Sequence, residues 1–83
     1  MNGAPRYIAQ NLGSTLDAQG RKRRWLAHQV GVSESLISKV IAGERTVDHA
    51  LAERITAIVG IPFFLLFDLH ERNESVSQAE HAA

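Results

Sequence analysis

The sequence predicts a single compact all-α domain of five helices, organised around two short helices joined by a tight turn. Two observations support this prediction. Apolar residues recur at the three- or four-residue spacing of helices, and glycine, proline and capping residues separate these stretches. Within Arg23 to Ala42, small, flexible and apolar residues also stand at the offsets that a helix-turn-helix requires, namely Ala27, Gly31, Val32, Ile37 and Val40.

Each of these positions has a steric reason. Ala27 is small where the two helices of the motif cross closely. Gly31 can adopt the left-handed backbone that ends one helix and redirects the chain. Val32 fills the corner, and Ser33 can cap the following helix, whose two apolar positions then face the core. Five matches in register are rare by chance.

Length and composition limit the alternatives. The chain has 83 residues, a formal net charge of zero and 45% hydrophobic residues, as expected for one small soluble domain. It has no cysteine, which excludes disulfides and thiolate metal sites. Because no apolar run approaches the span of a bilayer and no signal peptide is evident, we expect no membrane association and a location in the cytoplasm.

The zero net charge conceals an asymmetry. From Gly20 to Arg45 the chain carries six basic and two acidic residues, a net charge of +4. From Thr46 to its end it carries two basic and six acidic residues, a net charge of −4. A positive face on the motif would orient the domain toward a polyanion, whereas charge alone is equally consistent with a solvated basic loop.

The predicted elements follow one another along the chain. Residues 1–4 are expected to be frayed, and Pro5 opens a first helix to about Gln19, with an apolar stripe of Ile8, Leu12 and Leu16. Arg23 begins the second helix, whose inner face is Leu26, Ala27 and Val30. Trp25 either packs against the first helix, the favoured interpretation, or lies partly exposed beside DNA.

Asp48 is the expected N-cap of a fourth helix that runs to Val59. Its predicted core face is Leu51, Ile55 and Ile58, flanked by Ala52 and Val59. Gly60 ends this helix and Pro62 opens a short fifth one with the sequence PFFLLF. The composition then turns polar, so we expect a domain over residues 5–68 and a polar C-terminal tail over residues 69–83.

The segment Leu12 to Phe67 resembles the Cro/CI-type, lambda-repressor-like DNA-binding domain of phage repressors and of the wider XRE family. The resemblance rests on the motif residues given above, on the SKVIAGER stretch after the turn, and on the VGIPFFLL stretch after the fourth helix. It covers about two-thirds of the chain. It implies a five-helix fold that inserts its third helix into the major groove.

The resemblance also implies roles for individual residues. The position that opens the second helix, which grips a phosphate in such domains, is Arg23, where the helix N-terminus adds positive potential. Further phosphate candidates are Lys22, Arg24 and Arg45. The base-reading positions correspond to Glu34, Ser35, Ser38 and Lys39. Lysine can donate to guanine and glutamate can accept from cytosine, and we expect Glu34 to reject wrong sequences more than it adds affinity.

Two departures from the family pattern lead to further predictions. Many members pair an arginine in the first helix with a glutamate in the third, and here these positions are Leu16 and Ile41, which we expect to touch. The second departure is a fifth helix that is apolar on all sides. We interpret it as a homodimer interface, with a covering tail as the alternative; its residues are Phe63, Phe64, Leu65 and Phe67.

No residue pattern indicates an enzyme, a cofactor or a metal site. The four histidines lack a spacing suited to a shared metal, and no phosphate-cradling glycine loop or acid/base pair is present. The family resemblance implies a stand-alone Cro-like or immunity repressor of a phage or prophage, associated with the nucleoid of a bacterial host cell, that binds a double-stranded operator and no small-molecule substrate. The alternative is an antitoxin or other interaction module on the same scaffold.

Overall fold

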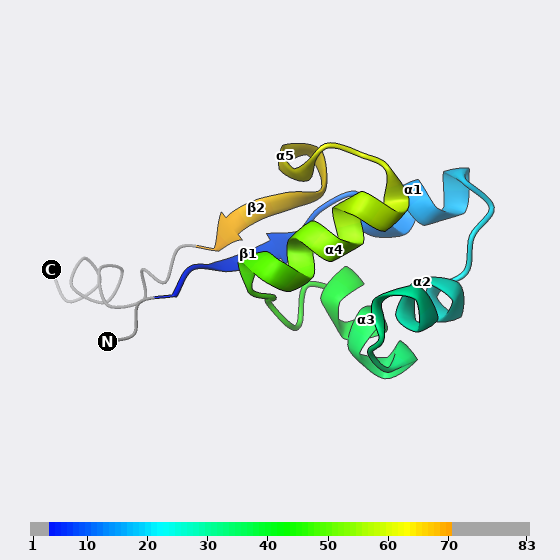
Figure 1. The fold of residues 1–83 in the computed structure, drawn as a ribbon, viewed down its shortest axis with the longest axis horizontal. Coiled ribbons are helices and arrows are strands. Elements are labelled where there is room, and N and C mark those ends of the chain that lie inside the picture. The colour runs from blue at the N-terminus through cyan, green and yellow to red at the C-terminus, as the bar shows by residue number, and fades with distance from the viewer. Residues whose placement is uncertain (1–3, 71–83) are drawn as a thin grey trace, which may run out of the picture.

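The computed structural model describes residues 4–70 and shows a mostly helical domain with two short strands (Figure 1). All five expected helices are present, but the prediction of an all-α domain is wrong because a small sheet joins the two ends of the described chain. In chain order the elements are β1 (Arg6–Ala9), α1 (Leu12–Ala18), α2 (Arg23–Val30), α3 (Glu34–Ile41), α4 (His49–Val59), α5 (Phe63–Leu66) and β2 (Phe67–His70).

The first helix is shorter than the prediction, since residues 6–9 form a strand and the helix begins only at Leu12. Asn11, with a φ of 60°, adopts the left-handed backbone that separates the two. Ile8 shares its spacing with Leu12 and Leu16, which made the segment look continuous. Tyr7 and Ile8 are residue types that suit strands, and distant pairing partners stabilise the extended backbone here.

The sheet is antiparallel, with Arg6 opposite His70, Tyr7 opposite Leu69, Ile8 opposite Asp68 and Ala9 opposite Phe67. On its other side, β1 exchanges two hydrogen bonds with Val47 through Tyr7. The strand β1 therefore lies between Val47 and β2. The second strand also continues to His70, two residues past the expected domain boundary at residue 68; the rest of the expected tail lies outside the described residues.

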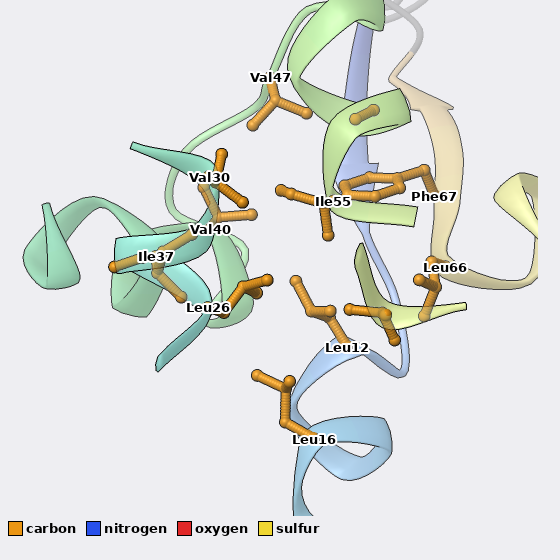
Figure 2. Packing of buried hydrophobic residues seen from close by; sticks show 13 residues of the cluster. Leu12, Leu16, Leu26, Val30, Ile37, Val40, Val47, Ile55, Leu66 and Phe67 are labelled. Carbon is orange, nitrogen blue, oxygen red and sulfur yellow. The ribbon is translucent and has the colours of Figure 1, made fainter. Parts of the chain in front are cut away.

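The core lies between the α2–α3 pair on one side and α1, the sheet and α5 on the other, with α4 contributing Ile55 in the middle (Figure 2). The stripes predicted for the first three helices are buried, apart from Ile8, which is only half-buried in β1. In α4 the fully buried residues are Ala52, Ile55 and Val59, whereas Leu51 and Ile58 are only partly buried. The buried face of α4 is thus rotated slightly from the predicted one.

The predicted caps of α3 and α4 and the predicted glycine ends of α2 and α4 are confirmed. The Ser33 hydroxyl accepts a hydrogen bond from the backbone N–H of Leu36 at 3.0 Å, and the Asp48 carboxylate accepts one from Leu51 at 2.8 Å. Gly31 and Gly60 end α2 and α4 with φ angles of 89° and 80°, the region that glycine occupies without strain. These local contacts fix the length and direction of α3 and α4.

The helices α1 and α3 approach closely at Gly13. A Cβ atom on Gly13 would lie 3.0 Å from the Cγ2 atom of Ile41, so an alanine there would require the Ile41 side chain to shift by a few tenths of an ångström. Leu16 is fully buried and Ile41 packs partly buried against the core, so neither lies in solvent. Two apolar side chains occupy the positions where the family resemblance implies an ion pair; their direct contact stays a prediction.

Candidate nucleic-acid interface

The helix α3 presents a polar face to solvent because its apolar residues turn inward. Ile37 and Val40 are fully buried, and they hold α3 against the core. Glu34, Ser35 and Lys39 are exposed, while Ser38 is half-buried. The 3.6-residue period of the helix therefore brings the four residues expected to read bases to the outward-facing side, within one turn and a half of each other.

The N-terminus of α2 borders a hollow with anion-binding chemistry. Lys22 precedes α2 in an extended conformation, and no side chain caps the helix there. The backbone N–H groups of the first turn are thus without a capping side chain, and the helix dipole adds partial positive charge at this end. The hollow is lined by Gly13, Leu16, Asp17, Arg21, Lys22, Arg23 and Glu34. Its three cations and the helix end favour a phosphate group, whereas the carboxylates of Asp17 and Glu34 in the same lining oppose one.

Glu34 has a neighbour that the sequence did not reveal. Its carboxylate lies 3.8 Å from Nε of Arg24, across the turn from α2 to α3. Both side chains are largely exposed, at 54% for Glu34 and 81% for Arg24, so the pair contributes little to stability. Its consequence is electrostatic, because Arg24 offsets part of the negative charge that Glu34 brings to an otherwise basic face.

Trp25 is partly buried and packs against the core. Its contact with α1 stays a prediction. The guanidinium carbon of Arg21 lies over its ring, 4.1 Å from the centroid. This cation–π contact holds Arg21 beside the start of α2 and leaves its charge accessible. Arg21 was not among the expected phosphate contacts, although it lies in the same basic run.

A second basic group lies around the loop after α3. Arg45, an expected phosphate contact, is exposed there. Arg6 reaches the same loop from β1, where it donates to the side-chain oxygen of Thr46 at 3.0 Å and to its carbonyl at 2.8 Å. Arg54 of α4 donates to the carbonyl of Val30 at the end of α2. Sequence reasoning missed Arg6, since only the unforeseen strand brings it here.

The four expected phosphate contacts, Lys22, Arg23, Arg24 and Arg45, are all exposed. Lys22, Arg23 and Arg24 gather at the start of α2, next to Glu34 of α3 through the shared hollow and the ion pair. Arg45 lies apart from them, in the loop beyond the other end of α3. The cations thus occur at the start of α2 and after α3, and the exposed polar residues of α3 lie between them in sequence.

The residues expected to form a dimer interface divide into two pairs. Phe67 is buried, with 3% of its surface exposed, and therefore belongs to the core of the protomer itself. Phe63 is half-buried in an aromatic group in which its ring centroid lies 5.1 Å from that of Tyr7 and 5.2 Å from that of His49. Phe64 and Leu65 are exposed, at 71% and 46%. The assignment of Phe67 to a dimer interface is corrected accordingly, while an interface at Phe64 and Leu65 stays a prediction.

Within residues 4–70, no cluster of three or more histidine, aspartate or glutamate side chains is placed to hold a metal ion. Over the same range, every helix is too short or too polar to cross a bilayer.

Comparison with known proteins identifies the fold. No protein-family model matches the chain, and no curated protein is significantly similar to it. Among solved structures, the chain is similar to a crystal structure described as that of a "putative DNA-binding protein from Bacteroides fragilis". The two share 21% sequence identity and superpose with a TM-score of 0.67, over 75% of this chain and 98% of the other. At this level of identity the match shows a common fold.

Proposed function

We propose that this chain is a sequence-specific, double-stranded-DNA-binding transcriptional regulator that inserts α3 into the major groove. The observation that carries the proposal is the exposed polar face of α3, held rigidly by the buried Ile37 and Val40. A major groove is wide enough for one α-helix, and serine, lysine and glutamate side chains can hydrogen-bond to base edges there.

The flanking cations supply the contacts that position such a helix. Arg23 stands at the open end of α2, where its guanidinium and the helix N-terminus both attract a phosphate. Lys22, Arg24 and Arg45 are exposed near the two ends of α3 and can neutralise further phosphates. Such contacts set register and affinity, whereas the residues of α3 read the sequence.

Two comparisons support this proposal. The fold is shared with a structure whose description names DNA binding. The residues also resemble the Cro/CI-type domain of the XRE family, on which the finer part of the proposal rests: a phage or prophage repressor that occupies an operator as a homodimer in the bacterial cytoplasm. We propose action by binding, with no catalytic step and no cofactor.

The experiment is selection of bound sequences from a random duplex pool, followed by affinity measurements over a range of salt. We expect a symmetric motif and a fall of log affinity with log salt at a slope of roughly −4 to −5, for four to six phosphate contacts per dimer. Arg23→Glu should weaken binding by about 10-fold or more and reduce the slope by about 1 per subunit.

Arg72→Glu is the matched control, because it changes the net charge equally outside the helix-turn-helix. If both substitutions weaken duplex binding equally, Arg23 acts only through the net charge of the protein and not through a specific phosphate contact. Unchanged duplex affinity in Arg23→Glu would contradict the proposed placement of α2 on the phosphate backbone.

A second function is supported by the other end of the molecule. Phe64 and Leu65 are exposed apolar side chains of the kind that bind protein partners. An antitoxin, or another interaction module on this scaffold, would use them to hold a second protein. The isolated chain would then show no sequence preference in the duplex selection, and a defined complex with the product of an adjacent gene would be required.

A further inference from the structure

The open edge of β2 carries backbone groups that have no partner within the described chain. The sheet there has two strands in the order β1–β2, so β2 has a strand on one side only. Tyr7 donates to the Val47 carbonyl at 2.8 Å and accepts from the Val47 N–H at 2.9 Å. Both backbone groups of Tyr7 therefore point away from β2.

The alternation of an antiparallel ladder then fixes the direction of the groups in β2. Tyr7 lies opposite Leu69, so these two form a pair without mutual hydrogen bonds. The backbone groups of Asp68 and His70 face β1, whereas the N–H and C=O groups of Leu69 face the open edge. At Phe67 the N–H group already donates to the Phe63 carbonyl, which ends α5. Leu69 thus offers both a donor and an acceptor.

Exposed apolar surface concentrates next to this edge. The large hydrophobic residues that are exposed in the described chain are Phe64, Leu65 and Leu69, at 71%, 46% and 47%. All three fall within one six-residue segment, where α5 leads directly into β2 (Figure 1). Hydrophobic side chains beside an unpaired strand edge are a feature of surfaces that bind another strand.

We propose that β2 pairs with β2 of a second copy of this chain, antiparallel across a two-fold axis at Leu69. In this register the two Leu69 residues exchange both hydrogen bonds. Asp68 then lies opposite His70 of the second copy, and the reverse pair forms by symmetry. A carboxylate thus meets an imidazole N–H donor twice, at the close spacing of a non-hydrogen-bonded pair.

Charge distinguishes the register with its axis at Leu69 from the alternative register with its axis at Asp68. An axis at Asp68 would also use the outward groups of the edge, but it would place two Asp68 carboxylates directly opposite each other. Like charges in that position are destabilising. The strand is therefore self-complementary in one register, and its exposed hydrophobic neighbours would be covered by their symmetry equivalents. This inference rests on the homodimer of the proposed function and names its interface.

The test is sedimentation equilibrium of the full chain without DNA, on variants that address the backbone and the charges separately. Leu69→Pro removes the outward N–H group without removing a bond to β1, since proline is tolerated on an edge strand when its nitrogen faces outward. Leu69→Ala is the matched control, because it shortens the side chain and keeps the N–H group. We expect Leu69→Pro to abolish the dimer and Leu69→Ala to weaken it less.

The charge variants test the register. His70→Asp places two carboxylates opposite each other twice and should raise the dimer dissociation constant by about 10-fold. Exchanging both residues in Asp68→His with His70→Asp restores complementary pairs and should return the constant to within about 3-fold of the original. Thermal unfolding of dilute protein verifies that each variant remains folded.

Three outcomes would overturn the inference. One is a monomer at every concentration, as expected if residues 71–83 cover the edge. Another is a dimer insensitive to Leu69→Pro. The third is dissociation by Phe64→Asp without any effect of His70→Asp, which would assign the interface to α5 alone. If the dimer proposal fails but these variants still bind duplex DNA in a salt-dependent way, the proposed DNA-binding function is retained. If the chain forms the β2-linked dimer but does not bind duplex DNA, the proposed DNA-binding function is wrong and the dimer interface is retained.

Discussion

The α2–α3 face and the α5–β2 end of this domain differ in the side chains that they expose and in the hydrogen bonds that stabilise them. On the α2–α3 face the exposed residues are charged or polar, and the supporting hydrogen bonds join residues three or four positions apart. At the α5–β2 end the exposed residues are largely apolar, and β2 is held by a strand from the opposite end of the described chain. Figure 1 shows α4 and β1 between the two regions.

The difference shows how each region depends on the common core. In the helix-turn-helix, a cap and a glycine turn mark where the helices begin and end, and burial of Ile37 and Val40 in the core stabilises α3. The α5–β2 segment has four-residue elements that would not persist alone. Leu66 and Phe67, both buried, therefore determine whether this end of the molecule exists as a structured surface.

The largest expected effect is at Phe67. Phe67→Ala should lower the free energy of unfolding by about 3–5 kcal/mol, because it empties a site in the core, whereas Phe64→Ala should change it by less than about 0.5 kcal/mol. Urea unfolding followed by circular dichroism measures both. Since a domain of this size could unfold entirely, Phe67→Leu provides a milder variant that should remain folded and still lose stability.

Equal losses at the two phenylalanines would contradict the division of this segment into a core residue and a surface residue. A large loss at Phe64 alone would mean that its side chain is covered in the folded protein. Either result would also remove Phe64 from the surface available to a second copy.

The helices were predictable because their signals are local. Ser33, Asp48, Gly31 and Gly60 each act within a few residues of their own position, so the sequence indicates them directly. The sheet was not predictable in this way. Its strands pair residues from opposite ends of the described chain, and the spacing of Ile8, Leu12 and Leu16 imitates one helix across the break at Asn11.

In the candidate site, too, features that depend on one helix were predictable and features that depend on packing between elements were not. The exposure of Glu34, Ser35 and Lys39 follows from the period of one helix, and the structure agrees with that prediction. The contact of Arg24 with Glu34 and the approach of Arg6 to Thr46 depend on how separate elements pack. Phe67 was misassigned for the same reason, since composition alone cannot tell a buried apolar residue from an exposed one.

The next effect in size tests the local contacts that begin α3 and α4. Ser33→Ala and Asp48→Ala each remove a side-chain acceptor for a backbone N–H group at a helix start. Each should cost about 1 kcal/mol in the free energy of unfolding. Ser33→Asp and Asp48→Asn keep an acceptor and should recover most of the loss. A cost near zero for both alanine variants would show that packing alone defines these helices.

The smallest expected change in stability is at Glu34, where function and stability separate most clearly. Glu34→Gln removes the charge from an exposed pair with Arg24, so the free energy of unfolding should change by less than about 0.5 kcal/mol.

On duplex DNA the same change frees Arg24 and removes a repulsive carboxylate, so affinity for unselected duplex should rise while discrimination falls. Binding selection with both proteins measures this, and an unchanged site preference would contradict a discriminating role. Arg24→Gln is the informative partner: if Glu34 acts through its own charge at a base edge, removing Arg24 should weaken duplex binding without relaxing the preferred sequence.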